Sequence, residues 1–282
     1  MKPTLFGTKY PIVCAPMFQV SDIKLALAVA NEGCLPTFHS RDLTQILEYK
    51  SITNSNKFGI FVELIGHPRE TYILDFLKHI NPQMVEMGLS QTFNTEYFKN
   101  FVEHAKDNGI KLVQKLTTPK DNRKFIVNIK GSEAAGLIGK NSTKENFLKQ
   151  KSLTLMEVCC SGGVADSNDL DWFIEKDASA IFIGTAFAMT KESSISEDVK
   201  IKLLNKNIND LKHITTDKRN GIVFDINTHD DDENGTQGLK LGVTNKGGHV
   251  YMGHALEKIT DIISVKELVK NLVQNSKYLK DF

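Results

Sequence analysis

Short apolar runs alternate with amphipathic stretches over the first two thirds of the chain. The apolar runs cover residues 11–15, 35–38, 57–64, 84–87, 111–116, 125–129, 155–159 and 180–183. Helix-like spacing lies between several of them, at residues 42–49, 71–79, 95–108 and 168–176. Strands that alternate with helices through short connections indicate a parallel sheet. Seven or eight strands favour closure, so the pattern predicts an α/β fold, a (β/α)8 TIM barrel, for which 282 residues suffice.

The pattern also predicts where several helices begin and end. Ser21 is expected to cap the first helix and Gly33 to end it, and Ser264 is expected to cap the last one. Residues 193–220 read as helical and polar, and the acidic run near Asp230 reads as a solvated loop. We therefore expect one domain over residues 1–282, with a C-terminal helical extension from about residue 191.

Composition narrows the classes of partner. A formal charge of +1 and 24% charged residues create no bulk field that would favour nucleic acid or a membrane. The N-terminus lacks the apolar core of a signal peptide, and the four cysteines form no CxxC pair. We expect a cytoplasmic protein with reduced thiols, no metal site and a small-molecule substrate; the oligomeric state is left open, a homo-oligomer being one option.

Two glycine turns are the sharpest local signal. Ser161, Gly162 and Gly163 follow one predicted strand, and Gly184 and Thr185 follow the next. Loops after the last two strands of such barrels commonly bind phosphate, because glycine lets backbone N–H groups approach the oxygens. The alternative is that these glycines only permit tight turns.

The opening PIVCAPMFQVSDIKLALAVANEGCLPTF resembles that of nitronate monooxygenases and FMN-dependent enoyl-acyl-carrier-protein reductases. The segments FGIFVEL, GIKLVQKLTT, KGSEAAGLIG, SGGVADSNDL, IGTAFAMTKES and MGHALEKITDIISVKEL resemble later family segments in the same order. The resemblance implies a flavin barrel with the FMN phosphate at the two glycine turns. It places Ala15, Pro16 and Met17 along the flavin ring, and Lys115 near N1 of the reduced flavin; each could equally be a core or surface residue.

The chain departs from the family pattern at three positions. Leu137 stands where the family has a histidine proposed as its base, and leucine cannot transfer a proton. Phe61 replaces a common asparagine, and His254 stands in a Gly-Gln position. His254 is the candidate relocated base, although a histidine in a loop is more often an ordinary surface residue. Lys130 and Glu133 flank the altered motif and could reach the site.

Three functions are compatible with this sequence. The leading hypothesis is an FMN-dependent oxidoreductase, resembling nitronate monooxygenase or enoyl reductase, with NADH or NADPH as one option for the reductant. The second is a flavin-free barrel lyase or isomerase on a phosphorylated substrate, with Lys115 as a Schiff-base nucleophile. The third is a non-catalytic regulatory barrel that still binds flavin or phosphate.

Overall fold

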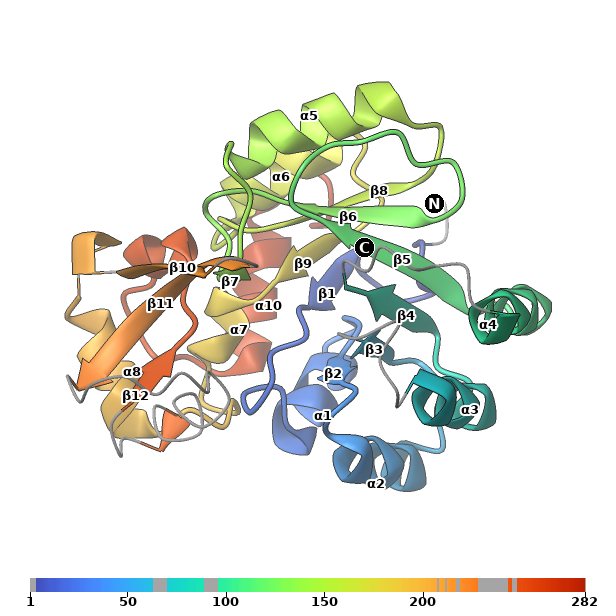
Figure 1. The fold of residues 1–282 in the computed structure, drawn as a ribbon. Coiled ribbons are helices and arrows are strands. Elements are labelled where there is room, and N and C mark those ends of the chain that lie inside the picture. Colours follow the sequence, from blue (N-terminus) through green and yellow to red (C-terminus); the bar gives the residue numbers. More distant parts are fainter. Residues whose placement is uncertain are drawn as a thin grey trace.

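The computed structural model describes residues 4–62, 70–88, 96–206, 208–210, 212–216, 219–227, 243–244 and 248–281. Eight parallel strands form the central sheet (Figure 1). Their bounds are β1 Ile12–Cys14, β2 Thr37–His39, β3 Gly59–Val62, β4 Met84–Met87, β5 Lys111–Leu116, β6 Ile126–Lys130, β8 Val158–Ser161 and β9 Ile181–Ile183. A parallel bridge between Val13 and Leu35 joins the two edges. The chain is therefore the predicted (β/α)8 barrel.

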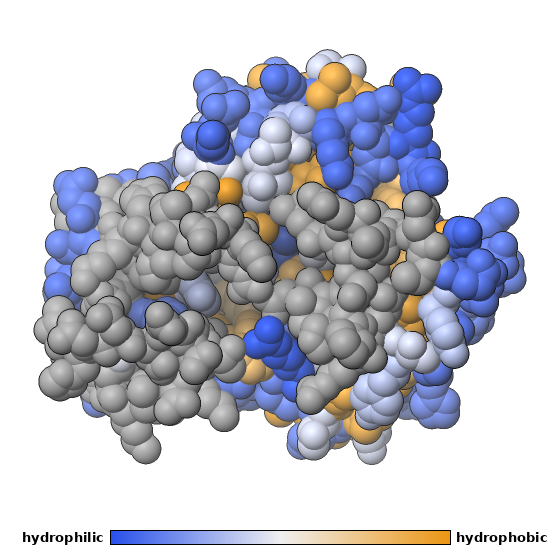
Figure 2. Space-filling view, in the orientation of Figure 1, coloured by the Kyte–Doolittle hydropathy of each residue, from blue (hydrophilic) through white to orange (hydrophobic). Residues whose placement is uncertain are grey.

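Helices surround the strands. They are α1 Ile23–Asn31, α2 Leu43–Thr53, α3 Glu70–Ile80, α4 Glu96–Asp107, α5 Thr143–Leu153, α6 Ser167–Glu175, α7 Thr185–Ala188 and α10 Val265–Gln274. No helix joins β5 to β6 across the described residues 117–125. The outer surfaces of α4 and α5 are mainly hydrophilic (Figure 2), as expected for helices that bury only one stripe.

Two helix starts differ from the sequence prediction. Asp22, and not Ser21, caps α1, because the Asp22 carboxylate accepts from the Leu25 N–H at 2.9 Å. Helix α5 was not predicted, although its capping box of Ser142 and Glu145 is a recognisable signal. The predicted cap at Ser264 is confirmed by a second capping box, with Glu267.

The barrel interior is apolar at its N-terminal end. Its cluster contains residues that alternate along the strands, among them Val13, Met84, Val113, Cys159 and Phe182, and Phe6 packs against them. The rings of Phe6 and Phe182 meet edge to face with centroids 6.4 Å apart. Because side chains alternate across a strand, the next inward positions lie one layer closer to the C-terminal end.

The segment after Thr190 corrects the helical prediction for residues 193–220. Among the described residues of that range, the helical ones are α8, Glu197–Leu204, and the short η1, Ile208–Asp210. Strands β10, Lys212–Thr216, and β11, Arg219–Asn227, pair with one another, and β11 also pairs with β12, Gly248–Val250. This sheet lies to one side of the barrel (Figure 1).

The segment after Thr190 packs on loops at the C-terminal ends of the barrel strands. Its apolar cluster joins Val199 and Val250 to Val20, Ile138 and Met189, which follow β1, β6 and β9. The acidic loop near Asp230 lies outside the described residues. Among the helices that the structure describes, none is long and apolar enough to cross a membrane.

Candidate functional site

The first glycine turn directly follows β8. Ser161 ends the strand and is buried, and Gly162 and Gly163 follow with φ values of +120° and +78°. A Cβ atom on Gly162 would lie 2.8 Å from the Cβ of Ala134 and 2.9 Å from the hydroxyl oxygen of Thr143. Backbone conformation and packing therefore both require glycine at position 162, whatever ligand the turn holds.

The second turn has a different character. Gly184 precedes α7 with φ −104°, which any residue can adopt. Among the described residues, a Cβ atom there would meet Ala15 and Met17, both at 3.7 Å. Neither conformation nor packing requires glycine at this position. Thr185 is buried, and its hydroxyl oxygen accepts the Gly253 N–H at 3.0 Å.

The first loop lies beside this second turn. The Ala15 N–H donates to the Ile183 carbonyl oxygen at 2.9 Å, which joins the end of β1 to the end of β9. Ser21 fixes the loop, because its hydroxyl oxygen accepts from the Met17 N–H at 3.1 Å. Ala15, Pro16 and Met17 are all partly exposed. The structure therefore brings the predicted first loop and the Gly184 turn together.

A polar layer fills the barrel above the apolar one. The Lys115 ammonium lies 2.8 Å from the Glu86 carboxylate, and the Asn128 amide donates to the other Glu86 oxygen at 2.6 Å. Lys115 also lies 3.7 Å from the centre of the Phe61 ring, within cation–π range. The side-chain carbonyl oxygen of Asn128 is buried and has no hydrogen-bond partner among the described residues. Phe61 thus contacts the predicted Lys115 in place of a polar side chain.

Lys130 lies at the end of β6, next to Ser161 in the parallel register. Its ammonium donates to the Ala135 carbonyl oxygen at 2.8 Å, and only 8% of the residue is exposed. Burial, reinforced by the nearby Lys115 ammonium and opposed by Glu86, lowers the pKa of Lys130 to about 7. Lys130 is therefore buried next to the first glycine turn, in line with the expectation that it could reach the site.

The altered family motif forms a structured loop. Leu137 lies in β7, Gly136–Leu137, which pairs with β11 through Gly221. Glu133 has a structural role, because its carboxylate accepts from both the backbone N–H and the hydroxyl of Thr143. The sheet formed by β10, β11 and β12 thus holds the loop that carries Leu137, through the pairing of β7 with β11.

His254 begins the short helix η2, His254–Lys258. Its backbone N–H donates to the Glu133 carbonyl oxygen at 3.0 Å, and a Cβ atom on Gly253 would lie 2.4 Å from that same oxygen. His254 is therefore adjacent to the altered loop and to Thr185. Its role as a base stays a prediction.

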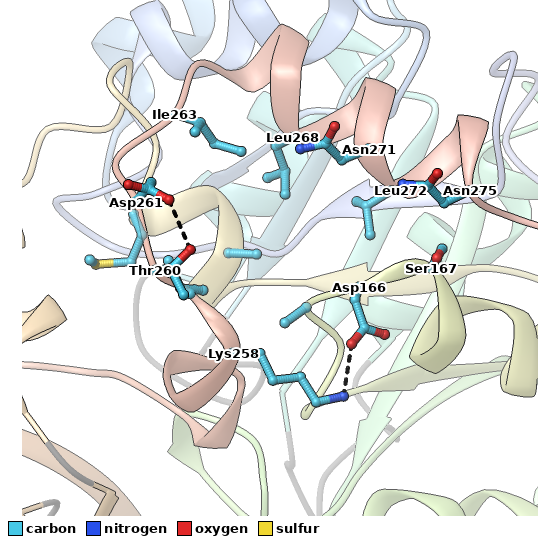
Figure 3. A pocket seen from close by; sticks show the side chains of 14 residues that line it. Asp166, Ser167, Lys258, Thr260, Asp261, Ile263, Leu268, Asn271, Leu272 and Asn275 are labelled. Carbon is cyan, nitrogen blue, oxygen red and sulfur yellow. Dashed lines mark hydrogen bonds and ion pairs between the residues drawn. The ribbon is translucent and has the colours of Figure 1, made fainter.

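A separate pocket of about 250 Å³ lies outside the barrel, between α6, η2 and α10 (Figure 3). Lys258 lies at its edge and pairs with Asp166 at 3.1 Å and with Asp169 at 2.7 Å. These carboxylates tie η2 to α6. The pocket does not include the polar layer inside the barrel, so it is not the predicted site.

Sequence reasoning missed three inward polar side chains. His39 lies between the rings of Phe18 and Phe61, at 5.2 and 5.3 Å, and Glu86 and Asn128 complete the polar layer. A signal was present, because Met84 and Glu86 are two residues apart and must share a strand face. The alternation does not determine the register between neighbouring strands, and that register decides which side chains meet.

Both the sequence and the fold resemble those of known proteins. The family model described as nitronate monooxygenase matches residues 124–275, more than half of the chain. FabK from Thermotoga maritima aligns with a TM-score of 0.81 and 20% identity, over 100% of this chain and 98% of that one. A nitroalkane oxidase from Streptomyces ansochromogenes aligns with a TM-score of 0.75 and 15% identity, over 97% of each chain. The two structural likenesses establish the fold, and the family match shows that this chain belongs to the nitronate monooxygenase family.

Proposed function

We propose that this protein is an FMN-dependent oxidoreductase that acts on a small organic substrate. The observation that carries the proposal is Gly184, which has an ordinary φ and room for a Cβ atom. Close approach of a ligand to the backbone is the remaining physical reason for glycine there. The turn lies at the C-terminal end of the last barrel strand, where phosphate sites of this fold are found.

The residues present fit the phosphate end of FMN. The Gly163 N–H makes no hydrogen bond within the described part of the chain, and Gly163 has positive φ. The Thr185 hydroxyl accepts from Gly253 and so keeps its own proton to donate. Ser161, Gly162, Gly163, Gly184 and Thr185 would hold the phosphate, and Ala15, Pro16 and Met17 would line the ring.

Bound FMN would supply electron transfer between the substrate and either oxygen or a nicotinamide. Lys115 would stabilise negative charge that develops nearby, since its ammonium is fixed by Glu86 and largely shielded from water. Phe61 would exclude water from the same region. We also propose NADH or NADPH as the reductant of the bound FMN.

The flavin-free alternative is weaker. A Schiff base requires the Lys115 nitrogen to attack a substrate carbonyl, but that nitrogen is already held by the Glu86 carboxylate at 2.8 Å. A regulatory role without turnover is motivated by Leu137, which offers no proton-transfer group. Reduction and reoxidation of bound flavin would distinguish that role from an enzyme.

The visible spectrum of the purified protein tests the proposal, recorded before and after incubation with FMN and gel filtration. Flavin that co-elutes in equimolar amount, and is then reduced anaerobically by NADH or NADPH and reoxidised by air, is the expected result. Protein that retains no FMN after desalting would contradict the proposal. Flavin that binds but is never turned over would favour the regulatory role.

A further inference from the structure

The polar layer brings two amines and one carboxylate together inside the barrel. Glu86, Lys115 and Lys130 come from the adjacent strands β4, β5 and β6. The Glu86 carboxylate is already occupied, by Lys115 at 2.8 Å and by the Asn128 amide at 2.6 Å. Its negative charge therefore balances Lys115, and the described residues provide no second carboxylate in the layer for Lys130.

Lys130 is the amine that no described carboxylate pairs with. Among the described residues it forms no ion pair, and its one hydrogen bond goes to a neutral group, the Ala135 carbonyl oxygen. Glu133, on the neighbouring loop, directs its carboxylate to Thr143 instead. A buried ammonium is costly unless it is paired, so the described residues leave Lys130 open to an anionic ligand.

We propose that Lys130 and Lys115 form a binding subsite for the carboxylate group of a small molecule. Two ammonium groups can each donate to one of the two oxygens. The Phe61 ring, 3.7 Å from the Lys115 nitrogen, provides an apolar surface for the body of such a molecule. The subsite names a substrate class for the proposed oxidoreductase, but its test does not require flavin.

Binding to this subsite is coupled to a proton. The pKa of Lys130 is about 7 because of burial and the neighbouring Lys115 ammonium, while Glu86 opposes the shift. Above that pH the free protein holds Lys130 neutral, so an anion must bring in a proton to gain the second ammonium. Affinity is therefore expected to be constant below pH 7 and to fall by about tenfold per pH unit above it.

Calorimetric titration with benzoate, a carboxylate with an apolar ring, tests the proposal between pH 6 and pH 9. Titrations at pH 8 in two buffers of different ionisation enthalpy measure the proton uptake. FMN content is determined on the same sample, so loss of flavin and loss of the anion subsite are separate results. We expect binding at pH 6 and uptake of close to one proton at pH 8.

Three variants complete the experiment. K130M should weaken benzoate binding at pH 6 by at least about tenfold, whereas K140M removes an equal charge from an exposed site ten residues away and should leave it unchanged. K130R keeps a permanent charge, so it should bind benzoate with no pH dependence, and it decides the matter if K130M does not fold. Wild-type protein that binds no benzoate at millimolar concentration, or K130M that binds it as well as wild type, would overturn the proposal.

Discussion

A few polar residues inside the barrel are expected to contribute strongly to the free energy of unfolding. Glu86 is fully buried, and Lys115 and Asn128 provide its only polar contacts among the described residues. A buried carboxylate that loses its cation keeps its desolvation cost and loses the compensating attraction. The polar layer therefore couples stability to the candidate site.

Removing the amine of Lys115 should expose this coupling. We expect K115M to lower the free energy of unfolding by about 3 kcal/mol, because Glu86 is left without a cation. Urea denaturation of the purified protein measures the change. In the double variant K115M/E86L no unpaired charge remains, and part of the loss should be recovered; equal losses in the single and double variants would argue against a buried ion pair.

Lys130 should make stability depend on pH. Its folded-state pKa of about 7 lies below the ordinary value of 10.5, so the unfolded state binds more protons between these values. The destabilisation is complete below pH 7 and shrinks as the pH rises toward 10.5. K130M, with its neutral side chain, should therefore gain about 2.7 kcal/mol more over wild type at pH 6 than at pH 9. Denaturation at both pH values provides the comparison, and an equal difference at the two would show that Lys130 titrates normally.

The two turn glycines should respond differently to alanine. G162A forces a side chain into positive φ and against Ala134, and should cost about 3 kcal/mol of stability. G184A should leave the stability of flavin-free protein within about 1 kcal/mol but weaken FMN binding by at least about tenfold. Thermal unfolding and quenching of FMN fluorescence measure the two effects. Unchanged FMN affinity in G184A would remove the main support for the phosphate site.

At the scale of elements, local signals mark most helix and strand boundaries. The capping boxes of α5 and α10 place Ser and Glu three residues apart, so each satisfies donors at a helix start without help from the rest of the fold. Strands β10 and β11 lacked such a signal. Their pairing joins residues 212–216 to 219–223, and their polar sequence was read as helix.

Loss of the Ser264 cap tests a local contribution. The Ser264 hydroxyl oxygen accepts from the Glu267 N–H at 3.2 Å, so S264A should destabilise the protein by about 1 kcal/mol. S152A is a matched control, because that exposed serine bonds back to the Lys149 carbonyl within α5. It should be neutral or slightly stabilising. Equal midpoints for S264A and wild type in urea would mean that α10 is held by packing alone.

At the scale of the whole molecule, FMN binding would join segments that are far apart in sequence. The first loop, the two glycine turns and the loop after β6 all belong to the region expected to hold it. We expect FMN at 100 times its dissociation constant to stabilise the protein by about 2.7 kcal/mol and to raise the melting temperature by several degrees. Differential scanning calorimetry measures this, with riboflavin, which lacks the phosphate, as the control ligand. An equal effect of both ligands would place the binding energy on the ring alone.

That residues 1–282 form a single domain stays a proposal.

The sequence by itself determined the alternation of strands and helices, the barrel class and the two glycine turns. These features depend on period-two apolar runs and glycine positions, which are local properties of the chain. It also placed Lys115 on a strand and Leu137 in the altered motif. Only the tertiary structure decided which side chains meet: strand register brought Glu86 to Lys115, and no carboxylate of the described residues pairs with Lys130. Likewise, only the packing shows that glycine is required at position 162 and is not required at position 184.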